Sequence, residues 1–310
     1  MEMYDFIQSP LNYTGGKFRL LPQIVPLFPR RVGTFVDLFC GGGNVGCNVP
    51  AQHTVFNDIN PHIIRLLRLF SETDKTVLFE KIQTVIRDYH LSMVCENGYA
   101  CYGCESTKGL SSYNKTPFLA LRNDLNALSP DDERYYLLLY VVVIFAFNNQ
   151  IRFNRSGRYN LPVGKRDFNR RMQKKVAAFC DRLQGMSRSF RCGDFSDMDI
   201  NALAADDFVY VDPPYFIACA TYNEQHGWQA EEEHRLLRFL DRLSERGVRF
   251  ALSNVLEAKG RENSILKAWL EENVRRYHVC HLDYSYSNAN YHLKDRGAHS
   301  DEVLITNYQP

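Results

Sequence analysis

The sequence lacks the features of an exported or membrane-spanning protein. Its first residues, Met1–Asp5, carry neither a basic cluster nor an apolar run, so we expect no signal peptide. The best apolar stretch, Leu137–Phe147, has only 11 residues and is too short to cross a bilayer. These absences favour a cytoplasmic protein without a membrane partner.

The sequence also has little net charge and no clear metal-binding pattern. Its 37 Lys and Arg residues nearly balance 36 Asp and Glu residues, so the net charge of +1 does not indicate a nucleic-acid partner. The nine cysteines are odd in number and irregularly spaced, which predicts reduced thiols. Cys95, Cys101 and Cys104 lie close together but lack the paired spacing of four zinc ligands. We therefore predict no metal and leave the role of these three cysteines open.

The most informative segment is Val209–Phe216, which reads Val-Tyr-Val-Asp-Pro-Pro-Tyr-Phe. Prolines cannot continue a strand ladder, so an apolar strand must end at Asp212. Ligands of open α/β sheets bind at this carboxyl end of the strands. Asp212 and the carbonyl of Pro213 can accept hydrogen bonds from an exocyclic amino group, and Tyr215 can stack on a planar ring. The segment therefore suits an amino-purine or amino-pyrimidine, with a plain Pro-Pro turn as the alternative without function.

A glycine-rich turn follows an earlier strand. The segment Phe35–Gly46 carries Gly41, Gly43 and Gly46 at the spacing of dinucleotide-binding turns. A second short strand ends at Asp58, which can accept both ribose hydroxyls of a nucleoside. The pattern predicts a nucleotide-like cofactor beside the turn, and a purely structural α/β turn is the alternative.

Two kinds of cofactor fit this turn. A nicotinamide dinucleotide would use the same turn and acid, but Asp37 at the strand end would repel its phosphates and attract a sulfonium or amino group. This favours S-adenosyl-L-methionine, which has no phosphate. In the upstream segment, Tyr13 could pack on a ring and Lys17 could meet a carboxylate such as a methionyl tail.

A local cluster of positive charge contrasts with the near-neutral total. From Gln150 to Lys175 there are nine basic residues and one acid, Asp167. Charge runs are commonly solvated faces, but aromatic and amide side chains alternate with these arginines, and Ser156-Gly157 supplies a turn, which predicts a β-hairpin. Such a ribbon can enter the major groove of DNA. The predicted DNA contacts are Arg152, Asn154, Arg155, Arg158, Asn160, Lys165 and Arg166.

Taken in order, these segments resemble the motifs of the alpha-group, or D12-class, DNA adenine-N6 methyltransferases, the family of Dam. The matching segments are Tyr-x-Gly-Gly-Lys at 13–17, Phe-x-Asp-x-Phe-x-Gly-Gly-Gly at 35–43, Asn-Asp-Ile-Asn at 57–60, the run 152–164 and Asp-Pro-Pro-Tyr at 212–215. Thr14 and Asn44 depart from the residues usual in the family beside the cofactor, and residues 94–117 match no motif.

The resemblance implies an α/β fold. We expect a doubly wound, mostly parallel sheet of the Rossmann-like methyltransferase type, with an inserted, largely helical DNA-recognition region that carries the hairpin. Residues 1–69 and 191–310 would form the catalytic domain that binds S-adenosyl-L-methionine, and residues 70–190 the target-recognition region. The 310 residues, 45% of them hydrophobic, suffice for such a core.

The resemblance also implies an activity and a set of site residues. The reaction would be site-specific transfer of a methyl group from S-adenosyl-L-methionine to N6 of an adenine flipped out of duplex DNA, by direct displacement. The catalytic residues would be Asp212, Pro213, Pro214 and Tyr215. The cofactor-binding residues would be Tyr13, Lys17, Asp37, Gly41, Gly43, Asp58, Asp194, Phe195 and Asp212.

Several alternatives stay open at this point. Methylation of N4 of cytosine or of adenine in RNA would use similar chemistry, and a non-catalytic DNA-binding regulator could keep the fold, although it would not need the tetrad at 212–215. The target sequence is not fixed, with GATC as a first guess. We expect a monomer that acts alone or with a cognate restriction endonuclease, and a second DNA contact in the loop Ser287–Ser300.

Overall fold

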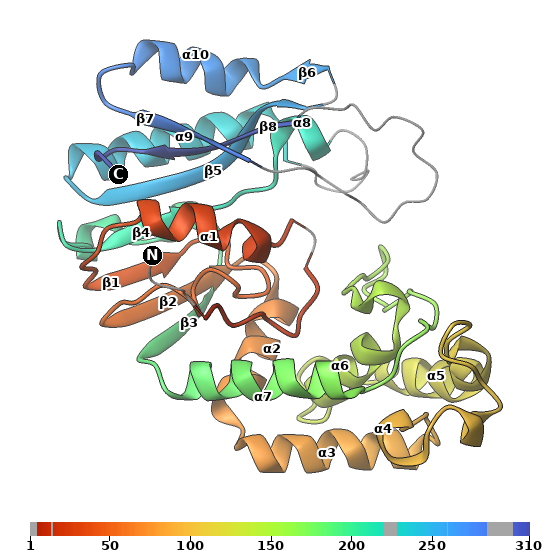
Figure 1. Ribbon diagram of the computed structural model, residues 1–310. Coiled ribbons are helices and arrows are strands. Elements are labelled where there is room, and N and C mark those ends of the chain that lie inside the picture. The colour runs from red at the N-terminus through yellow and green to blue at the C-terminus, as the bar shows by residue number, and fades with distance from the viewer. Residues whose placement is uncertain (1–4, 14, 220–227, 259, 284–299) are drawn as a thin grey trace.

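A mostly parallel β-sheet forms the centre of the molecule, as the computed structural model in Figure 1 shows. The structure describes residues 5–13, 15–219, 228–258, 260–283 and 300–310. Thr14 and most of the loop expected to contact DNA, residues 287–299, lie outside this part of the chain. The α/β fold with a Rossmann-like sheet that the sequence predicted is confirmed.

The strand order in the sheet is β3-β2-β1-β4-β5-β8-β7, and β6 pairs with β5 at one end. The first five strands of this order are parallel neighbours, whereas β8 runs antiparallel to both β5 and β7. The strands are β1 (Thr34–Asp37), β2 (His53–Asp58), β3 (Arg188–Cys192), β4 (Phe208–Val211), β5 (Arg249–Ala258), β6 (Arg261–Glu262), β7 (His278–Leu282) and β8 (Ser300–Thr306).

Helices cover the faces of the sheet and form the inserted region at the lower right of Figure 1. The α-helices are α1 (Leu21–Ile24), α2 (Pro61–Glu72), α3 (Lys75–Asp88), α4 (Val94–Asn97), α5 (Ser111–Leu125), α6 (Tyr135–Phe145), α7 (Arg170–Gln184), α8 (Phe216–Cys219), α9 (Ala230–Glu245) and α10 (Ser264–Glu272). Short 3-10 turns are η1 (Lys17–Leu20), η2 (Val25–Leu27), η3 (Ala100–Tyr102), η4 (Phe147–Asn149), η5 (Phe195–Asp197) and η6 (Ile200–Ala202).

Helix α2 connects the sheet with the inserted region. It begins at Pro61, whose fixed φ suits a first helical residue, and the Asn60 side chain caps it by accepting a hydrogen bond from the amide of His62. Its buried face includes Ile63, Ile64, Leu66 and Leu67. Phe70 extends this face and packs edge-on against Tyr140 of α6 and Phe179 of α7.

One hydrophobic core therefore runs from the sheet into the insertion. It joins Phe56 of β2 to the buried faces of α2, α3, α5, α6 and α7. The apolar run seen in the sequence becomes α6, which is buried on almost every side because neighbouring helices surround it. The predicted boundary between residues 69 and 70 falls inside α2, which belongs to this shared core. The division into a catalytic domain and a recognition region therefore remains a proposal.

The C-terminal strands extend the other end of the sheet. Strand β5 runs on to Ala258 because β8 pairs with it over most of its length. Strands β7 and β8 also pair with each other. Among the described residues, no helix is both long and apolar enough to cross a membrane.

Candidate functional site

Three acids meet at the carboxyl edge of the parallel strands. Asp37 ends β1, Asp58 ends β2, and Asp212 follows the last residue of β4. Strand β1 lies between β2 and β4 in parallel register, so the three strand ends face the same side of the sheet. The sequence predicted each of these positions separately, and the fold brings them to one edge.

Asp212 forms an ion pair with Lys17 across the site. The Nζ of Lys17 lies 2.8 Å from Oδ1 of Asp212 and donates a second hydrogen bond to the carbonyl of Gly15 at 3.0 Å. Only 5% of the Lys17 side chain and 17% of the Asp212 side chain are exposed. Burial raises the pKa of Asp212, and the Lys17 ammonium opposes this rise. The lysine predicted to meet a methionyl carboxylate thus has Asp212 as its partner here.

Tyr215 lies next to this pair. The Nζ of Lys17 is 4.8 Å from the centre of the Tyr215 ring, and the Tyr215 hydroxyl donates a hydrogen bond to Glu302 at 3.1 Å. Glu302 is fully buried on β8. Nothing in the local sequence pattern indicates that Glu302 on β8, which pairs with β5, would reach Tyr215.

The glycine turn after β1 permits close approaches. Gly41 has a φ of +47°, and a Cβ there would come 2.8 Å from the ring of Tyr13. At Gly46, a Cβ would come 2.3 Å from the ring of Phe56. The amide of Gly46 also donates a hydrogen bond of 2.8 Å to Asp37. The spacing that resembled a dinucleotide-binding turn thus places Tyr13 over the turn and fixes Asp37 beneath it.

Asp58 is held from two sides. Its carboxylate accepts hydrogen bonds from the amide of Gly41 at 2.9 Å and from the amide of Asn60 at 2.8 Å. Burial raises the pKa of Asp58, and these two bonds counteract part of the effect. Ile59, the next residue, is 68% exposed although it is apolar, so it offers a surface beside the acid that a planar ligand could cover. The motif at 57–60 contains Ile59, but its pattern alone did not indicate this exposed surface.

The pKa of Asp37 is strongly perturbed. Burial raises the pKa of Asp37 to about 8, and the neighbouring carboxylates of Asp212 and Asp58 add to the shift. The carboxyl group is therefore mostly protonated at neutral pH in this structure. Its predicted attraction for a sulfonium depends on ionisation, which a cation bound nearby would favour.

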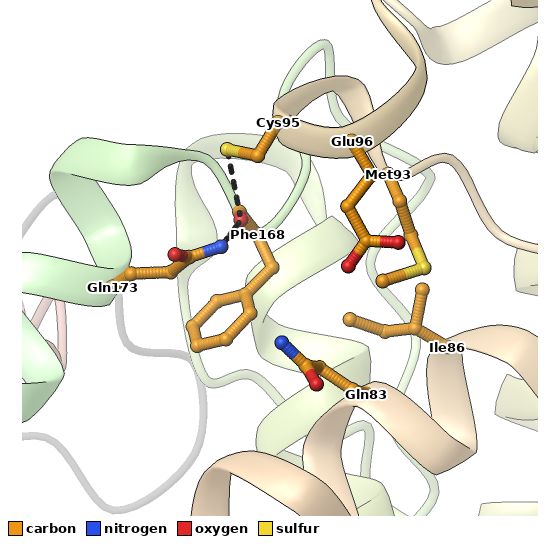
Figure 2. Close-up of a pocket in the computed structure, with 7 residues that line it drawn as sticks. All are labelled: Gln83, Ile86, Met93, Cys95, Glu96, Phe168 and Gln173. Carbon is orange, nitrogen blue, oxygen red and sulfur yellow. Dashed lines mark hydrogen bonds between the residues drawn. The ribbon is translucent and has the colours of Figure 1, made fainter.

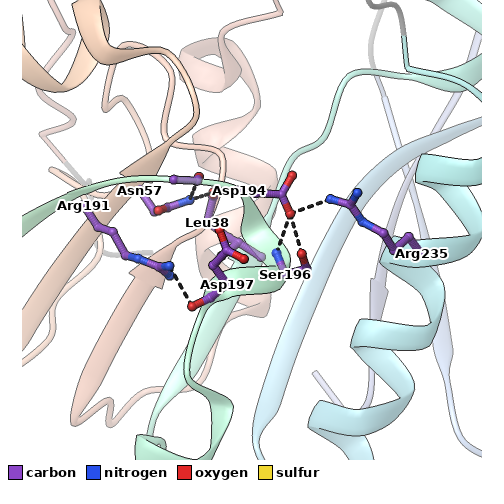
Figure 3. Close-up of polar contacts among 8 residues, drawn as sticks. Leu38, Asn57, Arg191, Asp194, Ser196, Asp197 and Arg235 are labelled. Carbon is purple, nitrogen blue, oxygen red and sulfur yellow. Dashed lines mark hydrogen bonds and ion pairs between the residues drawn. The ribbon is translucent and has the colours of Figure 1, made fainter.

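Asp194 and Phe195 lie after β3, on the same side of the sheet. Asp194 accepts hydrogen bonds from the amide and the hydroxyl of Ser196, and it forms an ion pair with Arg235 of α9 (Figure 3). Burial pushes the pKa of Asp194 upward, but these partners outweigh burial and hold the pKa below its usual range. The Arg235 guanidinium lies 4.8 Å from the centre of the Phe195 ring.

Phe195 itself is buried, with 3% of its surface exposed. It packs against Phe39, Trp228 and Phe239. Figure 3 also shows Asn57, whose side-chain amide donates to the carbonyl of Leu38. The aromatic group therefore forms one wall beside the ends of β1 and β3, and contact of Phe195 with a cofactor remains a proposal.

The predicted hairpin is a tight chain reversal with a single β-bridge between Phe153 and Tyr159. The Asn154 side chain organises the turn by accepting hydrogen bonds from the Ser156 amide, the Ser156 hydroxyl and the Arg158 amide. Tyr159 is 1% exposed and donates its hydroxyl proton to the carbonyl of Gln150. The predicted contacts Arg152, Asn154, Arg155, Arg158 and Asn160 are all exposed.

The basic side chains beyond the hairpin are also exposed, apart from the half-buried Lys175. Lys165 and Arg166 are at the surface, whereas Asp167 is 2% exposed and accepts a hydrogen bond from the amide of Val94 at 2.7 Å. The one negative charge in the run is thus turned inward. Phe147 lies just before the hairpin in the chain and is 49% exposed, an aromatic ring at the surface that the local pattern did not indicate.

The three clustered cysteines do not meet at one point that could hold a metal. Cys95 lies beside a small cavity between α3, α4 and the start of α7, where its thiol contacts the carbonyl of Phe168 (Figure 2). Cys104 contacts the carbonyl of Tyr102 and the hydroxyl of Ser112, and Cys101 is exposed. Within the described ranges, no group of three or more His, Cys, Asp or Glu side chains could hold a metal ion.

The parallel sheet, the glycine turn and the acids at its carboxyl edge define the class, an α/β protein with a Rossmann-like methyltransferase fold. The family model of the D12 class N6 adenine-specific DNA methyltransferases matches residues 13–288, and the chain belongs to this family. Membership of this family decides against an enzyme that uses the nicotinamide dinucleotide considered above.

Three relatives match nearly the whole chain. Modification methylase StsI of Streptococcus sanguinis and type II methyltransferase M.FokI of Planomicrobium okeanokoites are each 39% identical over 310 residues, which is 98% of this chain and 43% of the relative. Modification methylase LlaI of Lactococcus lactis is 32% identical over 97% of this chain and 43% of its own length. The chain thus spans less than half the length of these three relatives.

Proposed function

We propose that this chain transfers a methyl group from S-adenosyl-L-methionine to N6 of adenine in duplex DNA, at a specific sequence. The observation that carries the proposal is the meeting of Asp212, Tyr215 and Lys17 with two further acids at one sheet edge. Family membership supplies the reaction class, and relatives named as modification methylases support a cognate restriction endonuclease as partner.

The residues at the edge fit S-adenosyl-L-methionine. Three carboxyl groups surround the turn against one buried ammonium, that of Lys17, and a bound cation would favour the ionised form of Asp37, so the site suits a cationic ligand. Asp58 would accept the ribose hydroxyls through lone pairs that its backbone bonds leave available. Tyr13 would line the pocket above the glycine turn. When bound, the cofactor supplies the methyl group from its sulfonium.

Asp212 and the Pro213 carbonyl would orient the amino group of a flipped adenine. Both accept hydrogen bonds from N6–H, which directs the nitrogen lone pair toward the methyl carbon. As nitrogen bonds to the methyl carbon, the bond between that carbon and sulfur would break and leave the neutral thioether of S-adenosylhomocysteine. The amino group would give up a proton, which the Asp212 carboxylate can receive. The Lys17 ammonium favours the ionised form of Asp212 and so opposes the effect of burial on its pKa, and Tyr215 would stack on the base.

The exposed hairpin would select the target. Arg152 is suited to guanine and Asn154 or Asn160 to adenine in the major groove. Asn154 is committed to the turn through its side-chain oxygen, so Arg152 is the better candidate for a base contact. Arg155, Arg158, Lys165 and Arg166 would contact phosphates around it, because they are exposed on one basic stretch.

The test is transfer of radiolabelled methyl groups from S-adenosyl-L-methionine to duplex DNA, single-stranded DNA and RNA, followed by nucleoside analysis of the product. We expect N6-methyladenine in duplex DNA. Label in N4-methylcytosine or mainly in RNA would replace this proposal with one of the alternatives. No label on any nucleic acid, from a protein that binds duplex DNA, would favour a non-catalytic regulator.

A further inference from the structure

An aromatic contact joins the cofactor side of the molecule to the hairpin. The His62 ring stacks on the Phe153 ring, with 4.1 Å between the ring centres and an angle of 18° between the planes. His62 lies in the first turn of α2, and Phe153 lies in the hairpin, 91 positions later in the chain. Tyr135 and Tyr136 at the start of α6 flank the same histidine, at 5.9 Å and 6.0 Å.

His62 makes this contact as an aromatic ring rather than as a hydrogen-bonding group. Its Nδ1 is buried without a hydrogen-bond partner among the described residues. Burial lowers the pKa of His62, which favours the neutral imidazole. A neutral ring can stack on Phe153 without desolvating a full charge.

On the cofactor side, His62 is four positions after Asp58 and is linked to it by short hydrogen bonds. The amide of Asn60 donates to Asp58 at 2.8 Å, and the amide of His62 donates to the Asn60 side chain at 3.0 Å. A change in the position of Asp58 is therefore passed to the first turn of α2 through bonded groups, over a very short stretch of chain.

In the hairpin, Phe153 lies between Arg152 and Asn154. Its ring is half-buried, whereas the side chains of Arg152 and Asn154 are exposed to solvent. Phe153 also packs edge-on against Tyr159 at 5.7 Å. The backbone of Tyr159 is fixed in turn to the Asn126 side chain of the inserted region by two hydrogen bonds. The His62 ring therefore supports the side of the hairpin that carries Arg152.

We propose that His62 is a positioning residue that couples cofactor binding at Asp58 to sequence selection by the Arg152 hairpin, through its stack on Phe153. The inference rests on the proposed function, because it assigns a role to two parts of the same enzyme. Ligand at Asp58 would fix the first turn of α2, and the stack would then restrict the hairpin to the position that reads the target.

The experiment measures how much S-adenosylhomocysteine increases the preference of the full chain for its mapped target duplex over duplexes with one substituted base pair. We expect an increase for the wild type. An aromatic pair contributes a factor of about 2 to 12, so His62→Ala should lower the increase by that factor. His62→Phe should retain it, and adding His62→Ala to Phe153→Leu should have no further effect.

The matched control is His53→Ala. His53 begins β2, and Asp58 ends the same strand. The His53 ring contacts the hydroxyls of Ser187 and Ser189 instead of the hairpin. This variant should keep the wild-type increase. If His62→Ala lowers the thermal midpoint so far that binding cannot be measured, His62→Leu replaces it, since leucine fills the space without a ring, and the same loss is expected.

An unchanged increase in both His62→Ala and His62→Leu would overturn the coupling role. So would a loss in His62→Phe as large as that in His62→Ala, because a ring would then not suffice. A separate methyl-transfer assay on the wild type tests the proposed function independently of the coupling. If the wild type binds its target with ligand-dependent preference but transfers no methyl group, the proposed function fails while the coupling stands.

Discussion

The sheet edge and the hairpin are opposite in charge and in exposure. At the edge, Asp37, Asp58 and Lys17 are buried, and each is held by hydrogen bonds within the protein. In the hairpin, the arginines and asparagines are exposed, while only the inward-facing Phe153 and Tyr159 pack on the protein. If the proposed function holds, the groups proposed for chemistry are held by the protein itself, whereas we expect the groups proposed to read the target to acquire most of their partners from DNA.

The largest expected effect comes from removing the charge of Asp212. Asp212→Asn keeps the size of the side chain and a contact to Lys17, but it removes the carboxylate that orients N6 and receives its proton. We expect a decrease in kcat of about 10²- to 10⁴-fold, with target binding nearly unchanged. Single-turnover methyl transfer and duplex binding, measured on the same preparation, check this.

Asp212→Ala is a poorer test, because it would leave the buried Lys17 without its partner and could unfold the site. Asp199→Asn is a suitable control, since Asp199 only caps η6. Near-normal turnover in Asp212→Asn would remove Asp212 from the chemistry and leave the buried edge as a binding site alone.

The local structure around each site residue could be predicted from the sequence, whereas the contacts between residues far apart in the sequence could not. Prolines after an apolar run predict the strand end at Asp212, and a turn flanked by alternating side chains predicts the exposed face of the hairpin. By contrast, the sequence indicated both Lys17 and Asp212 as site residues, but it predicted a carboxylate of the cofactor as the partner of Lys17 and an amino group as the partner of Asp212. Their ion pair depends on how an N-terminal turn packs across β4, which local pattern does not encode.

The other missed contacts have the same cause. Arg235 pairs with Asp194 from 41 positions away, and Tyr215 bonds to Glu302 from 87 positions away. The extension of β5 likewise depends on its pairing with β8. Composition and periodicity report which face of an element is buried, but they do not report which distant element will cover it.

A second prediction contrasts two exposed basic residues, one in the hairpin and one on α7. Arg152→Ala should weaken binding to the target by about 1–3 kcal/mol and relax selection at one base pair. Lys174→Ala, on the exposed part of α7, should weaken target and non-target duplexes alike and reduce the slope of log affinity against log salt by about one. Binding to a panel of single-substitution duplexes at two salt concentrations separates the two behaviours.

If Arg152→Ala weakens every duplex equally, the hairpin only holds phosphates. The hydrogen bond from Arg152 to the Asn160 side chain allows one further check. Asn160→Ala should free the arginine without removing it, so its effect on selection should be smaller than that of Arg152→Ala.

The smallest predicted effect concerns Asp37 and pH. The pKa of Asp37 is about 8, so its carboxyl group is mostly protonated below that pH and ionised above it. A sulfonium gains from the ionised form, whereas the neutral thioether of S-adenosylhomocysteine does not. The affinity ratio of S-adenosyl-L-methionine to S-adenosylhomocysteine should therefore rise as pH increases through about 8, by roughly fivefold or more.

Calorimetric titrations with both ligands from pH 6 to 9 measure this ratio. Asp37→Asn should make the ratio independent of pH over this range, because the amide does not ionise. An equally steep rise in Asp37→Asn would assign the effect to another acid at the edge, Asp58 or Asp212, and would show that burial of Asp37 serves packing alone.

The most direct test of the whole account is to map methylated bases in the DNA of cells that express this chain and, in parallel, the Asp212→Asn variant. The account predicts N6-methyladenine at one recurring sequence with the wild type and its loss with the variant. Methylation that persists in the variant, or that falls on cytosine N4, would contradict the assignment of Asp212 and its neighbours as the site of adenine methyl transfer.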